Sequence, residues 1–373
     1  KRKNKKHFKE LKKNKFENID LVIVNFYPFE KTLKNTSSHR EIIEKIDIGG
    51  PSLVRAAAKN YNDVTVIVSP NQYNELIYEL DKTKGSTSES FRLRMSKFAF
   101  TETAYYESLI SNYFNRFTNE EFPIKKTFGA NLIDKLRYGE NPHQKAAVYS
   151  FKKELGLKQL NGKKLSYNNY NDIFTALLIS RSLPKNIGTV IIKHANPCGV
   201  SINRNSLESY KSALACDPIS AFGGVVSCNY KIKKKLALEL KKLFLEVIIC
   251  KGIENKAIKI LKNKKNLRII DASNFKNINL INISSQLNSY LLQTSDTFNF
   301  SKSNFKIVSK IKPNPKTLKN LIFAFNVCRF VKSNAIVIAN KNSTVGIGSG
   351  QPSRLDSCEI AINKMKKFVN PDD

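Results

Sequence analysis

The sequence lacks any apolar run approaching the roughly 20 residues that a membrane-spanning helix requires. Its first residues, 1–7, are almost all basic and lack the apolar stretch of a secretory signal. These two absences exclude a membrane-spanning segment and a signal of that kind. We therefore expect a cytoplasmic protein with no membrane partner.

The six cysteines include no Cys-x-x-Cys pair. A chain of this length does not depend on disulfide bonds, so we expect a reducing compartment. Cys198 follows Pro197, which is half of the zinc-deaminase signature, but Ser201 replaces its second cysteine and Asn196 replaces its acid. We therefore expect no catalytic metal, and we interpret Cys198 as a small buried residue.

Acidic residues are scarce, at 31 against 63 basic ones, and the formal net charge is +32. Such a charge raises the hypothesis of a basic nucleic-acid binder, which salt-sensitive binding with a base preference would support. The lysines are spread along the whole chain, and no regular alternation of basic and aromatic residues typical of an RNA-binding sheet is present. We therefore expect no specific nucleic-acid partner. The charge favours anionic small molecules instead.

The 373 residues, 41% of them hydrophobic, are enough for two or three globular domains. Apolar periodicity and turn residues predict α/β alternation, with a domain boundary in the polar stretch 118–126. A turn is expected at 48–51, a helix cap at Ser52, and irregular structure over 271–305. Strands are expected at 19–26, 64–68, 148–151, 189–193, 224–227, 247–250, 267–270 and 335–339. Helices are expected at 1–16, 40–46, 52–59, 71–80, 86–117, 172–182, 206–215, 231–244, 251–263, 315–330 and 354–368.

The most informative stretch is IIKHANPCG at residues 191–199, where a β-branched run ends in a Lys-His pair followed by Pro and Gly. This pattern predicts a buried strand that stops and turns, and such turns are where α/β enzymes place reactive groups. Lys193 supplies a positive charge or a proton donor, and His194 supplies a base that titrates near neutrality. The pair suits a reaction that removes a proton while negative charge develops nearby. Taken alone, a Lys-His dipeptide at a strand end is more often just a solvated edge.

Several long motifs accompany this stretch in a fixed order. They are NFYPFEK (25–31), IDIGGPSLVRAAAKN (46–60), LRYGENPHQ (136–144), DPISAFGG (217–224), VKSNAI (331–336) and GIGSGQPSR (346–354). In this order and spacing, the chain resembles the bifunctional purine-biosynthesis enzymes AICAR transformylase/IMP cyclohydrolase over nearly its whole length.

The resemblance implies an α/β fold in two parts. A partial methylglyoxal-synthase-like parallel-sheet domain, the IMP cyclohydrolase at residues 1–126, precedes partial deaminase-like α/β/α subdomains, the AICAR transformylase at residues 127–373. The implied function is formyl transfer from 10-formyltetrahydrofolate, as cosubstrate, to the 5-amino group of AICAR, followed by dehydrative ring closure of formyl-AICAR to IMP. The implied partners are these nucleotides, folate and a second copy of the chain in a homodimer.

In the transformylase, the resemblance assigns His194 as the base and Lys193 as the residue that stabilises charge or delivers a proton. Arg137 and Tyr138 match the grip on the ribotide, because a guanidinium suits a phosphate. The remaining matches to the substrate or cosubstrate pocket are Asn169, Phe222, Gly223, Glu246, Asn334, Gln351 and Arg354. Read singly, Arg137 also suits a surface ion pair and Phe222 a core position.

In the cyclohydrolase, Tyr27, Asp47 and Lys59 match the polar catalytic set of the family. Asp47 precedes a Gly-Gly pair whose backbone amides are expected to bind ligand oxygens. The alternatives are structural: Asp47 as a helix cap or turn residue, and Lys59 on a solvated helix face.

The chain also departs from the family pattern. The family has a further segment before Lys1 and another after Asp373, so we expect a fragment lacking both termini, and a non-catalytic remnant or ligand-binding fragment is the alternative function. Cys250-Lys251 stand where the family usually has Ala-Pro, and Pro352 fills the variable position of the Gln-x-Ser-Arg run. Both departures are expected near the substrate pocket.

Overall fold

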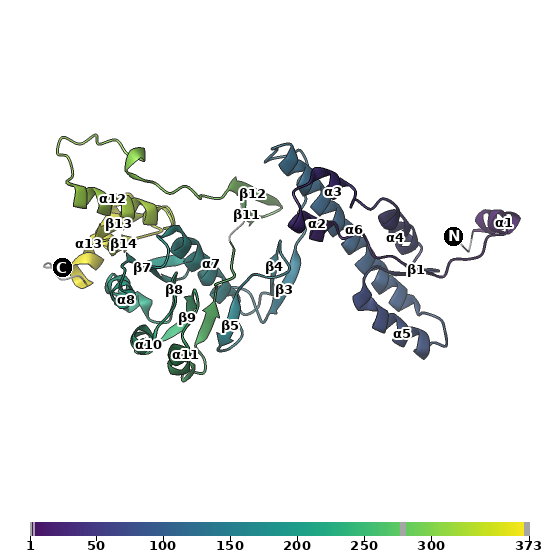
Figure 1. The fold of residues 1–373 in the computed structure, drawn as a ribbon, viewed down its shortest axis with the longest axis horizontal. Helices are drawn as coiled ribbons and strands as arrows, with labels where there is room; N and C mark the ends of the chain where they lie inside the picture. Colours follow the sequence, from purple (N-terminus) through teal and green to yellow (C-terminus); the bar gives the residue numbers. More distant parts are fainter. Residues whose placement is uncertain (1, 3, 277–280, 369–373) are drawn as a thin grey trace. The chain divides into compact units, whose positions relative to one another are not determined.

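The computed structural model describes residues 2, 4–276 and 281–368 of the chain, and Figure 1 shows the fold. The chain divides into two compact units, Lys1–Asn131 and Leu132–Asp373. Each unit has a hydrophobic core of its own, as expected for independent domains.

The first unit combines a small parallel sheet with helices. Strands β1 (Leu21–Ile23) and β2 (Thr65–Ile67) pair in parallel, with Val22 opposite Val66. Parallel strands need a long crossover connection, and helices provide it here. The helical elements of this unit are α1 (Lys5–Lys13), α2 (Phe29–Asn35), α3 (His39–Ile43), α4 (Gly49–Lys59), η1 (Pro70–Gln72), α5 (Tyr73–Lys82) and α6 (Glu89–Phe117).

Helix α6 supplies most of the core of the first unit. Its buried residues Phe91, Met95 and Ala99 recur every four positions, which places them on one face of the helix. They pack with Val54 and Ala58 of α4. The sequence left open whether this region forms one long helix or a broken one, and the structure shows a single uninterrupted helix of 29 residues.

Helix α4 begins earlier than the sequence predicts. The expected turn at 48–51 is wrong, because the two glycines belong to the first helical turn. The carboxylate of Asp47 accepts the N–H of Gly50 at 2.7 Å, so Asp47 stabilises the helix start. The expected cap, Ser52, instead donates its hydroxyl to the carbonyl of Ile48 at 2.9 Å.

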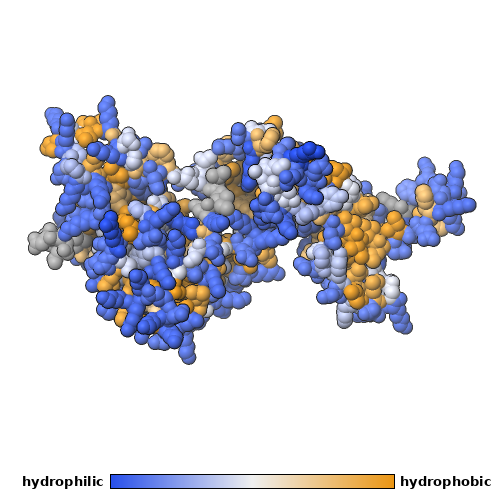
Figure 2. Space-filling view, viewed as in Figure 1, coloured by the Kyte–Doolittle hydropathy of each residue, from blue (hydrophilic) through white to orange (hydrophobic). Residues whose placement is uncertain are grey.

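Hydrophobic side chains also remain on the surface of the first unit. Figure 2 shows them gathered over the part of this unit that contains α4 and α6. The exposed side chains there include Leu21 and Ile23 of β1, Leu53 of α4 and Leu93 of α6. A two-stranded sheet covers little apolar area, so the described residues leave this surface open to solvent.

The second unit is built around an eight-stranded mixed sheet in the order β13-β14-β7-β6-β8-β9-β10-β5. Strands β8, β9 and β10 are parallel to one another, while β6 is antiparallel to both β7 and β8. The strands of this sheet are β5 (Lys158–Asn161), β6 (Gly188–Lys193), β7 (Asn196–Ile202), β8 (Gly224–Cys228), β9 (Leu245–Cys250), β10 (Arg268–Asp271), β13 (Ile336–Asn340) and β14 (Ser343–Gly348). Two smaller sheets pair β3 (Asn131–Leu136) with β4 (Ala146–Ser150), and β11 (Ile281–Gln286) with β12 (Ser289–Thr294).

Helices cover both faces of this sheet (Figure 1). Alternate residues of β6 point to opposite faces, so Ile191 packs with Tyr210 and Leu236, whereas Ile192 packs with Leu177 and Phe323. The helical elements are α7 (Tyr167–Ser182), α8 (Ser206–Ala215), α9 (Pro218–Ala221), α10 (Lys234–Leu240), α11 (Asn255–Lys262), η2 (Lys302–Asn304), α12 (Pro315–Cys328) and α13 (Arg354–Phe368). This three-layer arrangement confirms the predicted α/β class.

Several segments of the second unit differ from the sequence prediction, among them β3, β5 and β14, where no strand was expected. The region 271–305 is not irregular throughout, because 281–286 and 289–294 form an antiparallel hairpin. A further unexpected strand, β7, directly follows the predicted turn after Lys193. The two strands of the hairpin and β7 all contain Asn, Ser, Gly or Pro, which weaken the propensity signal for a strand.

Candidate active site

The Lys-His pair lies at a tight hairpin turn. Strand β6 ends at Lys193, which pairs with Asn196 at the start of β7. The two residues between them, His194 and Ala195, both have positive φ, at 53° and 55°. Two consecutive left-handed residues define the turn that matches the twist of a hairpin. The prediction of a buried strand that stops and turns is confirmed.

Asp172 of α7 supports this turn. Its carboxylate Oδ1 accepts the backbone N–H of Ala195 at 2.6 Å. Burial raises the pKa of the Asp172 carboxyl, while the bond from Ala195 and the nearby His194 imidazole oppose part of that rise. A partly buried acid therefore lies directly beneath the exposed histidine.

Sequence reasoning missed Asp172. The available signal was an acidic residue beside the apolar stripe of a predicted helix, since its neighbour Ile173 and the residue one turn later, Ala176, are fully buried. A carboxylate at the margin of a buried face needs a partner. The partner here comes from a turn 23 residues away in the chain, which no local pattern reveals.

Lys193 joins this turn to the segment after α9. Its Nζ donates to the carbonyl of Phe222 at 2.7 Å. Gly223 follows with φ of 71°, and its N–H donates to the carbonyl of Phe244 at 2.8 Å. The rings of Phe222 and Phe244 lie 5.2 Å apart, and Phe222 remains 57% exposed. Phe222 therefore offers an apolar surface beside Lys193 and is not a core residue.

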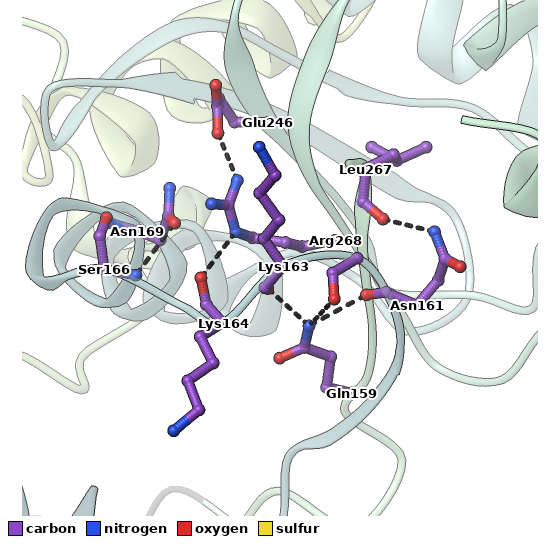
Figure 3. A network of polar contacts seen from close by, with 10 residues as sticks. Gln159, Asn161, Lys163, Lys164, Ser166, Asn169, Glu246, Leu267 and Arg268 are labelled. Atoms are coloured by element: carbon purple, nitrogen blue, oxygen red, sulfur yellow. Dashed lines mark hydrogen bonds and ion pairs between the residues drawn. The ribbon is translucent and has the colours of Figure 1, made fainter. Parts of the chain in front are cut away.

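A polar network borders the same edge of the sheet, at the start of β9 (Figure 3). Arg268 Nη1 contacts Glu246 Oε2 at 2.5 Å, and Arg268 Nε donates to the carbonyl of Lys164 at 3.2 Å. The side-chain amide of Gln159 donates to the backbone carbonyls of Asn161, Gly162 and Lys163, which fixes the loop between β5 and α7. Glu246 is thus fixed by a guanidinium that is itself nearly buried.

Asn169 lies beside this network at the start of α7 (Figure 3). Its side-chain oxygen accepts the N–H of Ser166 at 3.1 Å, and its own N–H donates to Ser166 Oγ at 3.2 Å. Such a reciprocal pair is a capping box. Asn169 is only 7% exposed, so the start of the helix employs much of its hydrogen-bonding capacity.

The third group of predicted residues joins the segment before β13 to the segment that leads into α13. Asn334 Nδ2 donates to the carbonyls of Gln351 and Pro352, at 3.1 and 2.8 Å. Arg354 is the first residue of α13. The N–H of Lys332 reaches Asn196 Oδ1 at 3.5 Å, and Asn196 opens β7. This group is therefore adjacent to the Lys193–His194 turn.

Arg137 and Tyr138 follow β3. The guanidinium carbon of Arg137 lies 5.9 Å from the centre of the Tyr138 ring. Asn168, in the first turn of α7, donates to the carbonyl of Glu140 at 3.4 Å, which ties this loop to the helix that carries Asp172. No ion pair among the described residues involves Arg137, so its exposed charge is available to an anion.

The first unit brings only two of its three predicted residues together. The N–H of Tyr27 donates to Asp47 Oδ2 at 3.3 Å, and the Tyr27 side chain is 55% exposed. Lys59 is the last residue of α4, whose first turn Asp47 stabilises. At 1.5 Å per residue, the helix separates them by roughly 15 Å along its axis. The Gly-Gly amide expected to be free for a ligand is, at Gly50, already bonded to Asp47.

Four of the six cysteines, Cys198 among them, are buried in the second unit. Cys198 is buried, and burial raises the pKa of Cys198, Cys216 and Cys228 to about 12 each, so these thiols stay protonated. Across the described residues, no group of three or more His, Cys, Asp or Glu side chains is placed to hold a metal ion. None of the helices in that part of the chain is long and apolar enough to span a bilayer.

The fold and the edge of polar residues define an α/β enzyme, and two family models identify which. The model described as "AICARFT/IMPCHase bienzyme" matches residues 57–364, and the model described as "MGS-like domain" matches residues 1–52. The chain belongs to the AICARFT/IMPCHase bienzyme family. It is accordingly an enzyme of purine biosynthesis, and the family catalyses the last two steps of that route.

The names of similar curated proteins agree with this family assignment. A "Bifunctional purine biosynthesis protein PurH" from Thermoanaerobacter sp. (strain X514) is 44% identical over 368 residues, covering 97% of this chain and 72% of the relative. Proteins of the same name from Prochlorococcus marinus (strain MIT 9515) and Bradyrhizobium diazoefficiens are each 41% identical, covering 99% and 97% of this chain and 73% and 70% of the relatives.

Proposed function

We propose that the second unit transfers a formyl group from 10-formyltetrahydrofolate to the 5-amino group of AICAR, and that the first unit closes formyl-AICAR to IMP. The observation that carries the first assignment is the Lys193–His194 turn, in which an exposed histidine and a half-buried lysine lie at a sheet edge above a partly buried carboxylate. Formyl transfer needs a base for the amine and a cation for the oxyanion, and this turn offers both.

His194 is the proposed base. The 5-amino group of AICAR is a weak nucleophile, and it loses a proton as its nitrogen bonds to the formyl carbon. The imidazole of His194 accepts that proton, and the carboxylate of Asp172 below the turn stabilises the resulting imidazolium electrostatically. The fixed turn geometry limits the imidazole to a narrow range of positions.

Lys193 is the proposed partner of the developing oxyanion. One of its three ammonium protons is donated to Phe222, which leaves two for the tetrahedral intermediate and then for the departing folate nitrogen. Phe222 and Gly223 supply an apolar wall and a side-chain-free approach for the folate ring. Glu246, held by Arg268, supplies an acceptor for folate N–H groups.

The nucleotide is proposed to bind through charge and amide groups. Arg137, with Tyr138 beside it, binds the phosphate, since a guanidinium matches phosphate oxygens in two directions. Asn334, Gln351 and Arg354 are proposed to meet the carboxamide side of AICAR. Asn169 contributes through the first turn of α7, where its side chain already caps the helix.

Ring closure is proposed for Tyr27, Asp47 and Lys59 of the first unit. Tyr27 is an exposed proton donor, and Lys59 provides positive charge. Asp47 acts mainly by positioning, because its carboxylate connects Tyr27 to the start of α4. We also expect the chain to act as a cytoplasmic homodimer without a nucleic-acid partner.

The test is turnover by this chain with AICAR and 10-formyltetrahydrofolate, beside calorimetric titration with AICAR. His194→Ala should lower formyl transfer by about 10²–10⁴-fold while AICAR still binds. The matched control is His7→Ala, a histidine of α1 in the other unit, which should leave both measurements unchanged. Undiminished turnover by His194→Ala would refute the assigned base.

Arg137→Ala separates binding from chemistry. It should abolish saturable AICAR binding, because the phosphate loses its guanidinium partner. A folded chain that binds AICAR but shows no turnover would instead support the non-catalytic, ligand-binding alternative.

A further inference from the structure

A small cavity lies at the other end of the large sheet. Its volume is about 180 Å³, and it is formed by the second half of α7 and the ends of β8, β9 and β10. Gly224 starts β8 beside the Lys193–Phe222 contact, whereas Cys228 ends the strand at the cavity. Four steps along a strand span roughly 13 Å. The cavity is therefore separate from the proposed transformylase site.

Two departures from the family pattern line this cavity. Cys250 and Lys251 were expected near the substrate pocket, and that expectation is wrong, because β9 carries them away from Glu246 to the opposite end of the sheet. Cys250 lies directly beside Cys228 in the register of β8 and β9. Both residues thus lie away from the proposed chemistry.

The rim of the cavity is strongly basic. Arg181, Lys185 and Lys251 line it, and none of the three takes part in an ion pair among the described residues. Arg181 is fixed by hydrogen bonds to the carbonyls of Ala272 and Phe275 and by the ring of Phe275, 4.8 Å away. Carbonyls orient the guanidinium but do not neutralise it.

In the part of the chain that the structure describes, Asp271, the acid next to the cavity-lining residue Ala272, forms no ion pair with this rim. Asp271 ends β10, and its carboxylate oxygen already accepts the N–H of Gly252 at 3.2 Å and the N–H and hydroxyl of Ser273 at 2.9 and 2.6 Å. The surrounding protein lowers the pKa of the Arg181 guanidinium by desolvation, although the residue as a whole remains exposed. A cation without a carboxylate partner is open to a bound anion.

The floor of the cavity is apolar. It consists of Leu177, Leu183, Ile249 and the two thiols Cys228 and Cys250, and burial raises the pKa of both thiols, which keeps them neutral. The neutral polar side chains on the wall are committed. The oxygen of Asn229 accepts the N–H of Gly188, and its amide donates to the carbonyls of Ser180 and Pro184. The hydroxyl of Ser227 donates to that of Ser180 at 3.0 Å.

We propose that this cavity is a second ligand site, which binds a small organic anion with an apolar body, such as an aromatic carboxylate. The charged end meets Arg181, Lys185 and Lys251, and the ring covers the apolar floor. The volume of about 180 Å³ is below the roughly 300–1,000 Å³ of pockets for drug-sized ligands, which limits the occupant to about one ring.

The experiment titrates benzoate into the full chain, with benzamide as its neutral counterpart, and follows binding by calorimetry and thermal shift at low salt. Benzoate should bind one-to-one and raise the melting temperature, whereas benzamide should not. Binding should weaken as salt is added. Saturating AICAR should leave benzoate binding unchanged, because the two sites lie at opposite ends of the sheet.

Variants locate the site. Lys185→Ala and Lys251→Ala remove exposed charges and should each weaken benzoate binding by about 5- to 10-fold, while formyl transfer stays unchanged. Arg181→Gln should weaken it more, and its fold is checked by circular dichroism because it also loses two backbone contacts. The matched control is Lys259→Ala on the exposed face of α11, which should have no effect.

Three outcomes would overturn the proposal. Benzoate binding that survives Lys185→Ala and Lys251→Ala would place the anion elsewhere. Competition by AICAR would assign it to the nucleotide site. Equal binding of inorganic phosphate would show that charge alone is recognised, without a role for the apolar floor. Loss of formyl transfer in His194→Ala has no bearing on these results, so the two proposals fail independently.

Discussion

Lys193 and His194 of the second unit end a central strand of an eight-stranded sheet, whereas Tyr27 and Asp47 of the first unit lie beside a sheet of two strands. In the second unit, separate elements fix the reactive turn: α7 bonds Ala195, and the segment after α9 bonds Lys193. In the first unit, Asp47 serves mainly to start a helix. Site residues identified from the same kind of sequence motif therefore differ in how many elements of the fold hold them in place.

The largest expected effect tests how tightly the second unit is packed. A methyl group at Gly199 of β7 would lie 1.9 Å from the carbonyl oxygen of Ala213 in α8, whereas nothing lies within 4 Å of one at Gly49 in α4. Gly199→Ala should destabilise the second unit by about 3 kcal/mol or more, because backbone must move. Gly49→Ala should stabilise the first by about 0.4–1 kcal/mol.

Denaturant unfolding that resolves the two units measures both changes. If Gly199→Ala proved as harmless as Gly49→Ala, the contrast in packing between the units would be lost.

The second effect concerns the start of α4. Asp47→Ala removes the acceptor for Gly50 and Tyr27, and the loss of such a contact at a helix start costs about 0.5–2 kcal/mol. The first unit should unfold at lower denaturant, and ring closure should fall with it. Asp81→Ala on the exposed side of α5 is the control and should change stability by less than about 0.5 kcal/mol. Equal effects of the two would remove the structural role of Asp47.

The third effect is a pH dependence of stability that is confined to the second unit. Burial raises the folded-state pKa of Asp172, so its contribution to stability is present when it is protonated and is lost as pH rises through the raised pKa. Asp172→Asn keeps an acceptor for Ala195 but cannot ionise. Its stability relative to the natural chain should therefore increase as pH rises from the acid range through that pKa. Melting temperatures of the two proteins across pH provide the measurement, and a difference independent of pH would contradict it.

The smallest expected change in stability is that of Tyr27→Phe. The Tyr27 hydroxyl belongs to an exposed side chain, so its removal should alter unfolding by less than about 0.5 kcal/mol. Ring closure should nevertheless fall, because the proposed proton donor is lost, while formyl transfer remains. A large loss of stability would show that Tyr27 is held as firmly as the residues of the second unit.

Local patterns predicted the elements that carry strong periodicity. The β-branched run before Lys193 and the Pro and Gly after it predicted the strand and its turn, and the four-residue apolar spacing of 91–99 predicted α6. The hairpin 281–294 was missed because its Asn and Ser residues carry little strand propensity.

The parts of the site that depend on distant partners were not predictable. Nothing near Asp172 in the sequence reveals its bond to Ala195. The role of Asp47 at the helix start was one of the structural alternatives, but the sequence did not decide between it and Ser52 as the cap. The position of Cys250 at the far end of the sheet follows from the direction of β9 relative to β6, which is a property of the topology. Candidate site residues were therefore easier to identify from the sequence than the residues that they contact in the fold.

All six cysteines lie at or beyond position 198, so every thiol belongs to the second unit and the first unit has none. Four of them are buried. The rate at which the thiols of the native chain are alkylated consequently measures the opening of the second unit alone. The number of modified thiols, measured by mass spectrometry during slow exposure to a thiol reagent, would report local unfolding of the second unit. The first unit would contribute no signal, and no added label is needed.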